Sequence, residues 1–269
     1  MERPSIAIIP SAYKTGVLAA VLPNNGIADL DFTRGSTATR INAQGLIEEV
    51  GVNVPRLDYS DGGCPSLLLG IQSTNLIIYS EDFSNESWAK TGATVTSNTE
   101  IAPDGNLTAD TLTSTGAGQL QFSILGTSET NYNVSFWIKR KTGTGIVYIR
   151  SVENANTPVT ITNQWTRVNL TTLSTSLSIR AGVKLDTIGD EVYIWGGQLE
   201  QQSSATSYIP NYGTTEGITR LEDSASLDLT PFNITSIIET IDGVEQPPIT
   251  TIPTIYNAPI GRVNKILMY

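Results

Sequence analysis

The chain has 269 residues, enough for two modules, and only 16% of them are charged. Its 26 Asp and Glu exceed its 16 Lys and Arg, and the net charge of −10 argues against binding to a nucleic-acid backbone or docking by charge on an anionic membrane. Histidine is absent and Cys64 is the one cysteine, which excludes His-dependent catalytic triads, His-ligated zinc and an intramolecular disulfide.

Residues 1–75 are predicted to form short extended pieces joined by turns. The opening MERPSIAIIPSAYKTG has an acid at position 2 and an apolar run broken by prolines, so we do not expect a signal peptide and expect folding in the cytoplasm where the chain is made. Asn42–Gly45 and Asp61–Gly63 are turn signals, and Leu67–Leu69 is a short apolar run. No apolar run approaches the roughly 20 residues of a membrane-spanning helix, so we expect no membrane insertion.

Residues 76–212 alternate apolar and polar side chains in five short segments. These are 119–125 (QLQFSIL), 133–141 (NVSFWIKRK), 145–151 (GIVYIRS), 177–185 (LSIRAGVKL) and 191–197 (EVYIWGG). Successive side chains of a strand point to opposite faces, so this alternation predicts half-buried strands. Several such strands between turn signals predict a β-sandwich or jelly roll.

Residues 213–269 begin as a polar linker in which Asp223 is a candidate helix cap. Two short apolar runs, 234–241 and 263–269, flank a proline-rich bridge at 243–261. Prolines at this density exclude a helix or a central strand in the bridge.

The predicted fold is therefore all-β: a β-sandwich or jelly roll flanked by N- and C-terminal extended β segments. We expect residues 1–75 to form an attachment or assembly segment and residues 76–212 to form a carbohydrate-binding-like jelly roll. Residues 213–269 would form a C-terminal β segment that packs or assembles.

A candidate binding face follows from the second face of the alternating strands. It carries Gln121, Trp137, Tyr148, Arg150, Arg180, Tyr193 and Trp195. An aromatic ring can stack on the C–H face of a sugar while Arg and Gln donate to its hydroxyls, so these residues indicate a carbohydrate-binding face. The alternatives are that the aromatic rings form a second layer of core, a seam between modules, or a protein interface, because aromatic residues in strands mostly pack. Trp88 and Trp165 lie beside turns and are expected to be structural.

Paired carboxylates are candidates for a glycosidase site, which needs two acids on opposite sides of the scissile bond. The pairs are Glu48 with Glu49, Glu81 with Asp82, Asp186 with Asp190, and Glu222 with Asp223. Neighbouring acids on a strand point to opposite faces, so we expect loop and cap charges and no enzyme activity. No cofactor is expected; a structural calcium ion held by Asp82, Asp186 and Asp190 is the one alternative, although EF-hand spacing is absent. Cys64 is expected to be a packing residue rather than a nucleophile.

Several longer phrases of the sequence resemble a family of bacteriophage virion structural proteins. They are FTRGSTATRINAQGLIEEVGVNVPRLDY, CPSLLL, QSTNLIIYSEDFSNESWAK, APDGNLTADTL and VYIWGGQLEQQSSATSYIP, which together span about residues 31–210. The C-terminal ITSIIETIDGVEQPPITTIPTIY and GRVNKILMY also resemble endings of such proteins. One departure lies at Gly70 and Ile71, where members commonly carry Glu-Pro.

The resemblance implies a non-enzymatic virion component, a tail or tail-fibre appendage with a carbohydrate-binding-like jelly roll. The expected partners are other virion proteins, further copies of the same chain (trimers are common among fibres) and a host-surface glycan. Residues 1–75, with 213–269, would attach or assemble, and the jelly roll would project outward.

Two other functions remain open at the level of sequence. The protein would be purely architectural, as a capsid decoration, head fibre or tail sleeve, if the aromatic face were internal. It would be a depolymerase if two acids converged across a cleft. The expected location is the virion in each case.

Overall fold

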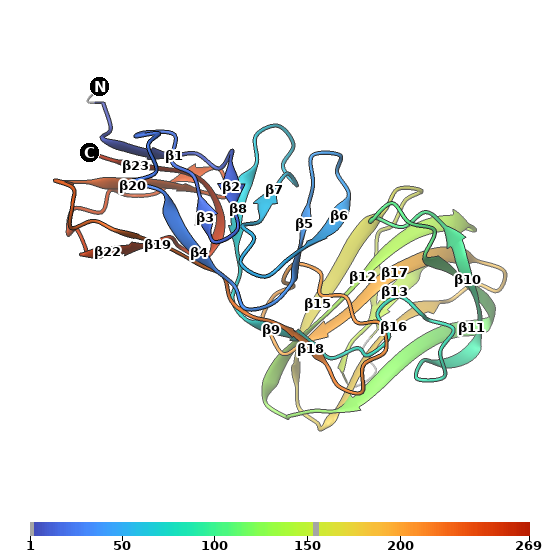
Figure 1. Cartoon of the computed structure of the whole chain (residues 1–269). Helices are drawn as coiled ribbons and strands as arrows, with labels where there is room; N and C mark the ends of the chain where they lie inside the picture. The colour runs from blue at the N-terminus through green and yellow to red at the C-terminus, as the bar shows by residue number, and fades with distance from the viewer. Residues whose placement is uncertain (1–2, 153–155) are drawn as a thin grey trace. The chain divides into compact units, whose positions relative to one another are not determined.

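In the computed structural model, which describes residues 3–152 and 156–269, the protein is built from antiparallel β-strands (Figure 1). The described part holds no α-helix and hence no helix that could cross a membrane. The all-β class predicted from the sequence is confirmed. The chain divides into two compact units: unit 1 comprises Met1–Gln72 and Arg220–Tyr269, and unit 2 comprises Ser73–Thr219. The boundaries predicted from the sequence, 75/76 and 212/213, differ from these by a few residues.

Unit 1 combines strands from both ends of the chain. They are β1 (Ile6–Ile8), β2 (Tyr13–Lys14), β3 (Val17–Leu18), β4 (Leu30–Thr33), β5 (Ala38–Ile41), β6 (Ile47–Val50), β7 (Leu57–Asp58) and β8 (Ser66–Leu69), followed by β19 (Ser224–Asp228), β20 (Ile237–Ile241), β21 (Val244–Glu245), β22 (Ile255–Asn257) and β23 (Gly261–Met268). One sheet has the order β21-β20-β23-β8-β7 with β1 also paired to β23, another has the order β2-β3-β4-β19-β22, and β5 and β6 form a hairpin. Ile6 pairs with Met268 and Phe32 with Ala225, so each large sheet needs both chain ends.

The core of unit 1 is likewise shared between the two ends. Ile6, Phe32 and Leu67 from the N-terminal segment pack in one cluster with Ile237 and Ile266 from the C-terminal segment, and each is at most 1% exposed. Burial of one such side chain stabilises the fold by about 1.5–3 kcal/mol. The apolar run near the C-terminus is thus held as a central strand.

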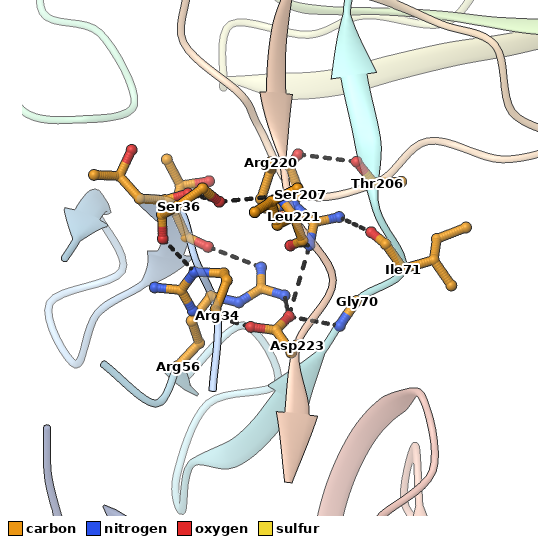
Figure 2. Close-up of polar contacts among 12 residues, drawn as sticks. Arg34, Ser36, Arg56, Gly70, Ile71, Thr206, Ser207, Arg220, Leu221 and Asp223 are labelled. Atoms are coloured by element: carbon orange, nitrogen blue, oxygen red, sulfur yellow. Dashed lines mark hydrogen bonds and ion pairs between the residues drawn. The ribbon is translucent and has the colours of Figure 1, made fainter. Parts of the chain in front are cut away.

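A buried ion cluster around Asp223 joins the segments of unit 1 (Figure 2). Arg34 Nη1 donates to Asp223 Oδ1 at 2.9 Å and Arg56 Nη2 forms an ion pair with Oδ2. Arg220 Nη1 lies 3.6 Å from Oδ2, and the backbone N–H of Gly70 donates to the same oxygen at 2.8 Å. The four charged side chains are at most 1% exposed. The expectation that Asp223 caps a helix is therefore wrong: it precedes a strand and binds guanidinium groups.

Three guanidinium groups share one carboxylate in this cluster, so the remaining donors turn to backbone carbonyl oxygens. Arg34 donates to the carbonyls of residues 36, 51 and 54, and Arg220 Nη2 donates to that of Ile71 at 2.6 Å. Burial lowers the pKa of Arg56, and the ion pair with Asp223 offsets part of that effect.

Unit 2 contains the predicted jelly-roll strands. They are β9 (Ser73–Asn75), β10 (Ala89–Glu100), β11 (Ala109–Leu125), β12 (Thr130–Thr142), β13 (Val147–Arg150), β14 (Asn156–Val159), β15 (Thr166–Ser174), β16 (Ser178–Leu185) and β17 (Glu191–Glu200), while β18 (Ile218–Arg220), which pairs with β9, begins in unit 2. Each of the five alternating segments of the sequence forms all or part of a strand, as predicted.

The long strand β11 divides the main sheet of unit 2 into two layers. Its residues 110–113 pair with β17 and its residues 118–125 pair with β16, while β10 runs beside it. We call β14, β13, β16 and the second part of β11 layer A, and the first part of β11 with β17, β12 and β15 layer B. Inward side chains of both layers, such as Ile149 from A and Phe136 from B, pack in one core. This arrangement is a β-sandwich.

An aromatic cluster fills this core. Trp88 is 1% exposed, and its ring centroid lies 5.0 Å from Phe83, 5.4 Å from Phe122 and 6.0 Å from Phe136. Its indole N–H donates to the carbonyl of Tyr79 at 3.0 Å, which satisfies the one polar group of the side chain. The structural role expected for Trp88 is confirmed.

Candidate functional site

The seven residues of the predicted binding face lie on two different faces of unit 2. Layer A carries Gln121, Tyr148, Arg150 and Arg180, whereas layer B carries Trp137, Tyr193 and Trp195. The inward faces of the two layers share one core, so their outer faces point away from each other. The seven residues therefore do not form one site.

The outer face of layer A is polar and already hydrogen-bonded. Gln121 Nε2 donates to Ser123 Oγ at 3.0 Å, and the hydroxyl of Tyr148 donates to Asp186 Oδ2 at 2.7 Å. The ammonium of Lys184 lies 5.0 Å from the Tyr148 ring centroid and so occupies one face of that ring.

Arg150 and Arg180 stand on the same outer face of layer A, but they differ in exposure. Arg150 is 4% exposed, and burial lowers its pKa, with the nearby charge of Arg180 adding to the decrease. Arg180 is half-buried, and its strand neighbour across the sheet is Ser123 of β11. Among the predicted residues of this face, Arg180, Gln121 and Tyr148 are thus the accessible ones.

The outer face of layer B is partly covered by the polar segment that follows β17. Trp195 is 1% exposed, its ring centroid lies 4.7 Å from that of Tyr208, and its N–H donates to Thr108 Oγ1 at 3.1 Å. Arg167 holds the covering segment by donating to the carbonyl of Thr206 at 2.7 Å. Trp195 therefore belongs to a second layer of core, which was the alternative to a binding role.

The double glycine after Trp195 shapes this covered surface. Between Ser135 and Trp137 the register of β12 with β17 shifts by one residue, which is a β-bulge on β17. Gly196 has φ +61°, and a Cβ there would lie 3.0 Å from the ring of Trp137. The glycine thus allows the bulge and the close approach of the half-buried Trp137 together.

Tyr193 also lies on layer B and is engaged by lysines. The ammonium groups of Lys139 and Lys141 stand 5.6 and 5.5 Å from its ring centroid. Lys139 pairs with Glu100 at 3.4 Å and Lys141 with Glu191 at 3.3 Å. Cation–π contacts of this length stabilise by about 0.5–1 kcal/mol at exposed sites, so this ring is part of a surface charge network.

Unit 2 contains a cavity of about 400 Å³ that sequence reasoning missed. We call it the Tyr79–Tyr212 pocket, because these two residues face each other across an antiparallel bridge at its wall. Its lining consists of Tyr79, Glu81, Asp82, Ser84, Ser97, Asn98, Thr108, Asp110, Asn211 and Tyr212. Four separate segments supply them, so no local pattern could have revealed the pocket.

The carboxylate of Asp110 holds two walls of the pocket together. Its Oδ1 accepts the backbone N–H of Asn98 and its Oδ2 that of Phe83, both at 3.0 Å. Asn98 has φ +56°, a left-handed conformation that asparagine tolerates, within an irregular stretch of β10. Burial raises the pKa of Asp110 to about 6 despite these hydrogen bonds.

Glu81 and Asp82 both line this pocket. The sequence argument that adjacent acids diverge holds for strands, but these two lie in the turn-rich segment between β9 and β10. Glu81 Oε1 accepts the hydroxyl of Tyr208 at 2.9 Å, and burial raises the pKa of Glu81 to about 7. Asp82 is exposed, and its Oδ1 accepts the backbone N–H of Ser84 at 3.1 Å.

The rings of the pocket present apolar surface beside these acids. Tyr212 is 73% exposed, and Tyr79 is half-buried. Gly213 has φ +103°, and a Cβ there would lie 2.5 Å from the Tyr79 ring, so only glycine permits this approach. An aromatic plate beside carboxylates, amides and hydroxyls can stack on a ring-shaped ligand and bind its hydroxyl groups.

The three candidate calcium ligands, Asp82, Asp186 and Asp190, each accept hydrogen bonds from other protein groups. Asp186 accepts from Tyr148 and Lys184, and Asp190 Oδ2 accepts from Arg140 at 3.3 Å and from the backbone of Gly145 at 2.8 Å. Across residues 3–152 and 156–269, no group of three or more acidic or thiol side chains is arranged to hold a metal ion. Cys64 is exposed rather than packed, so the expectation of a packing role is wrong.

No protein-family model matches the chain, and no curated protein matches it. Among solved structures it is similar to the enzymatically active domain of tailspike protein 4 of bacteriophage CBA120, with 16% identity, a TM-score of 0.37, and coverage of 47% of this chain and 21% of that chain. It is also similar to the CBM22-1 xylan-binding domain from Paenibacillus barcinonensis, with 13% identity, a TM-score of 0.36, and coverage of 51% and 96%. A CBM61 module in complex with β-1,4-galactotriose gives 14% identity, a TM-score of 0.37, and coverage of 48% and 99%.

These are distant structural similarities to carbohydrate-binding modules and to a phage tailspike domain, and they assign no family. The chain spans about a fifth of the length of the tailspike chain. With identities of 13–16% and TM-scores of 0.36–0.37, the matches carry no argument about function. The pocket and the sequence are therefore the features that bear on function.

Proposed function

We propose that the protein is a non-enzymatic bacteriophage virion component, a tail or fibre appendage, and that unit 2 contacts a host-surface glycan. The observation that carries glycan binding is the Tyr79–Tyr212 pocket, in which a 73% exposed tyrosine stands beside three carboxyl groups and two asparagines. Its volume of about 400 Å³ is in the usual range of small-ligand pockets, about 300–1,000 Å³. The virion location and the virion partners rest on the resemblance of residues 31–210 to phage structural proteins.

The pocket replaces the seven-residue face as the proposed contact. Trp195 is buried, so its ring cannot stack on a ligand. Tyr148 with Gln121 and Arg180 remains a second candidate surface on layer A, whereas the pocket offers a hollow of about 400 Å³ for a sugar ring.

A glycan array with matched tyrosine variants tests this proposal. Tyr212→Ala removes the exposed ring of the pocket, and we expect binding at least tenfold weaker, a loss of about 1.4 kcal/mol. Tyr193→Ala is the control, because it removes a surface tyrosine of layer B outside the pocket, and we expect binding within about twofold of the native protein. Loss of binding in Tyr148→Ala with full binding in Tyr212→Ala would move the site to layer A.

The hydrogen bonds of Asp110 and Glu81 support a non-enzymatic role. Both oxygens of Asp110 already accept backbone N–H groups, and an oxygen of Glu81 accepts from Tyr208. A depolymerase needs one carboxyl to protonate a leaving group and another to attack or to activate water. Release of new reducing ends from a bound oligosaccharide, abolished by Glu81→Gln, would overturn this part of the proposal.

The purely architectural role is the second candidate, favoured by the burial of Trp195 as a second core layer. It predicts that the native protein binds no glycan on the array. Particle-bound protein would then place unit 2 against neighbouring subunits.

A further inference from the structure

The Tyr79–Tyr212 pocket has an acidic lining without a cation. Glu81, Asp82 and Asp110 contribute carboxyl groups, and none of the ten lining residues is a lysine or an arginine. Lys90 is the cation whose charge lowers the pKa of Asp110. Its ammonium group donates to three backbone carbonyl oxygens within residues 84–88 at 2.8–2.9 Å, so its hydrogen atoms are directed to the chain itself. The ionised carboxylates of the lining therefore favour a positive charge in the pocket, and no lysine or arginine of the lining offsets them.

The aromatic rings of the lining also favour a positively charged ligand. The face of an aromatic ring carries negative electrostatic potential and attracts a cation within about 6 Å of its centroid. The rings of Tyr148 and Tyr193 on this protein already hold lysine ammonium groups at 5.0–5.6 Å. At the pocket the rings are those of Tyr79 and Tyr212, which line it together with three carboxyl groups.

We infer that the pocket prefers a glycan bearing an ammonium group, such as an oligosaccharide with free amino sugars, over the corresponding neutral glycan. This inference rests on the proposed glycan binding and names the ligand class of that site. The sugar ring would stack on Tyr212, and the ammonium group would lie among the carboxylates of Glu81, Asp82 and Asp110. A neutral N-acetylated sugar offers the same ring without the charge.

The protonation of the pocket supports this geometry. Burial raises the pKa of Glu81 to about 7 and that of Asp110 to about 6, so part of the carboxyl groups carry a proton near neutral pH when the pocket is empty. A bound cation favours the ionised carboxylates and lowers both pKa values. Binding of an ammonium ligand at pH 6.5 is therefore coupled to release of protons to the buffer.

The experiment compares acetylated and free-amine forms of the same oligosaccharides on one array, with chitin and chitosan oligomers of equal length as the first pair. We expect the free-amine form to bind about tenfold more tightly. Equal binding, or tighter binding of the acetylated form, overturns the inference and leaves glycan binding intact. Absence of binding to every glycan overturns the proposed function, so the two failures are distinguishable.

Two variants and a calorimetric readout place the preference in the pocket. Asp82→Asn keeps the Oδ1 acceptor that binds the backbone of Ser84 but removes the charge, and we expect it to reduce the preference for the free-amine form severalfold. Glu245→Gln removes an exposed acid of unit 1 and is expected to leave the preference unchanged. Calorimetry in two buffers of different ionisation enthalpy should show proton release with the amine ligand. A preference that survives Asp82→Asn and releases no proton would arise from general charge attraction and would refute the site.

Discussion

Replacement of Asp223 by asparagine is expected to destabilise unit 1 and to leave the stability of unit 2 unchanged. The carboxylate forms ion pairs with three guanidinium groups of unit 1, and its side chain is fully buried. Asparagine has nearly the same shape but no charge, and its amide nitrogen would point at a guanidinium that needs an acceptor. The variant therefore removes the charge and leaves the cavity filled.

The expected loss of stability follows from the groups that bind the Asp223 carboxylate. It forms ion pairs with Arg34 at 2.9 Å, with Arg56 and with Arg220 at 3.6 Å, and it accepts the N–H of Gly70 at 2.8 Å. Removal of one partner from a buried ion pair costs about 3–5 kcal/mol, because the other charge stays buried without compensation. Here three cations lose their anion, so we expect at least about 3–5 kcal/mol out of a typical domain stability of about 5–15 kcal/mol.

The assay uses the separate location of the tryptophans. Trp88, Trp137, Trp165 and Trp195 all belong to unit 2, so intrinsic tryptophan fluorescence reports that unit, while far-ultraviolet circular dichroism reports both. In urea we expect Asp223→Asn to shift the circular dichroism transition to lower concentration and to leave the fluorescence midpoint in place. Asp228→Asn changes an exposed acid of the same strand, β19, and is the control. A loss below about 1 kcal/mol in Asp223→Asn, the size of a surface ion pair, would refute this reasoning.

Three further predictions concern unit 2. The folded state raises the pKa of Glu81 from 4.5 to about 7, so folding retains a proton that the unfolded chain loses, and the free energy of unfolding falls as pH rises through this window. In melts from pH 4.5 to 8, Glu81→Gln should reduce that decrease and leave the part that comes from the raised pKa of Asp110, whereas an unchanged slope would contradict the shift. Gly196→Ala forces alanine into φ +61° against Trp137 and should destabilise the unit by about 1–3 kcal/mol in urea, whereas a neutral effect would show that the bulge adapts. Trp88→Ala empties the centre of the aromatic cluster and should lower the free energy of unfolding by about 3–5 kcal/mol. Trp165→Ala, at a half-buried site, should lower it clearly less when both variants are followed by circular dichroism in urea.

The strands and their buried faces could be read from the sequence because alternation is a local property. Val134, Phe136 and Ile138 occupy every second position, and all three are fully buried in β12. The period of two in a strand requires no knowledge of the partner strand. The same holds for the turn at Asp61–Gly63, where both glycines adopt positive φ.

The binding face could not be read in the same way, because alternation says that a side chain points outward but not to which side of the molecule. Tyr148 and Trp137 have the same pattern in sequence, yet they lie on opposite layers, since β11 bends from one layer into the other. Whether an outward residue is exposed also depends on what covers it. Trp195 is buried because Tyr208, from the segment after β17, packs on its ring.

The sequence by itself determined the all-β class, the buried face of the five alternating segments and the acidic, histidine-free chemistry, since these follow from residue type and local spacing. Tertiary structure decided the rest. It joined Arg34 and Asp223 in one buried cluster and brought Tyr79, Asp110 and Tyr212 around one pocket. Contacts between residues far apart in the chain depend on strand pairing and on the competition of all burial and hydrogen-bond terms at once, which no single segment encodes.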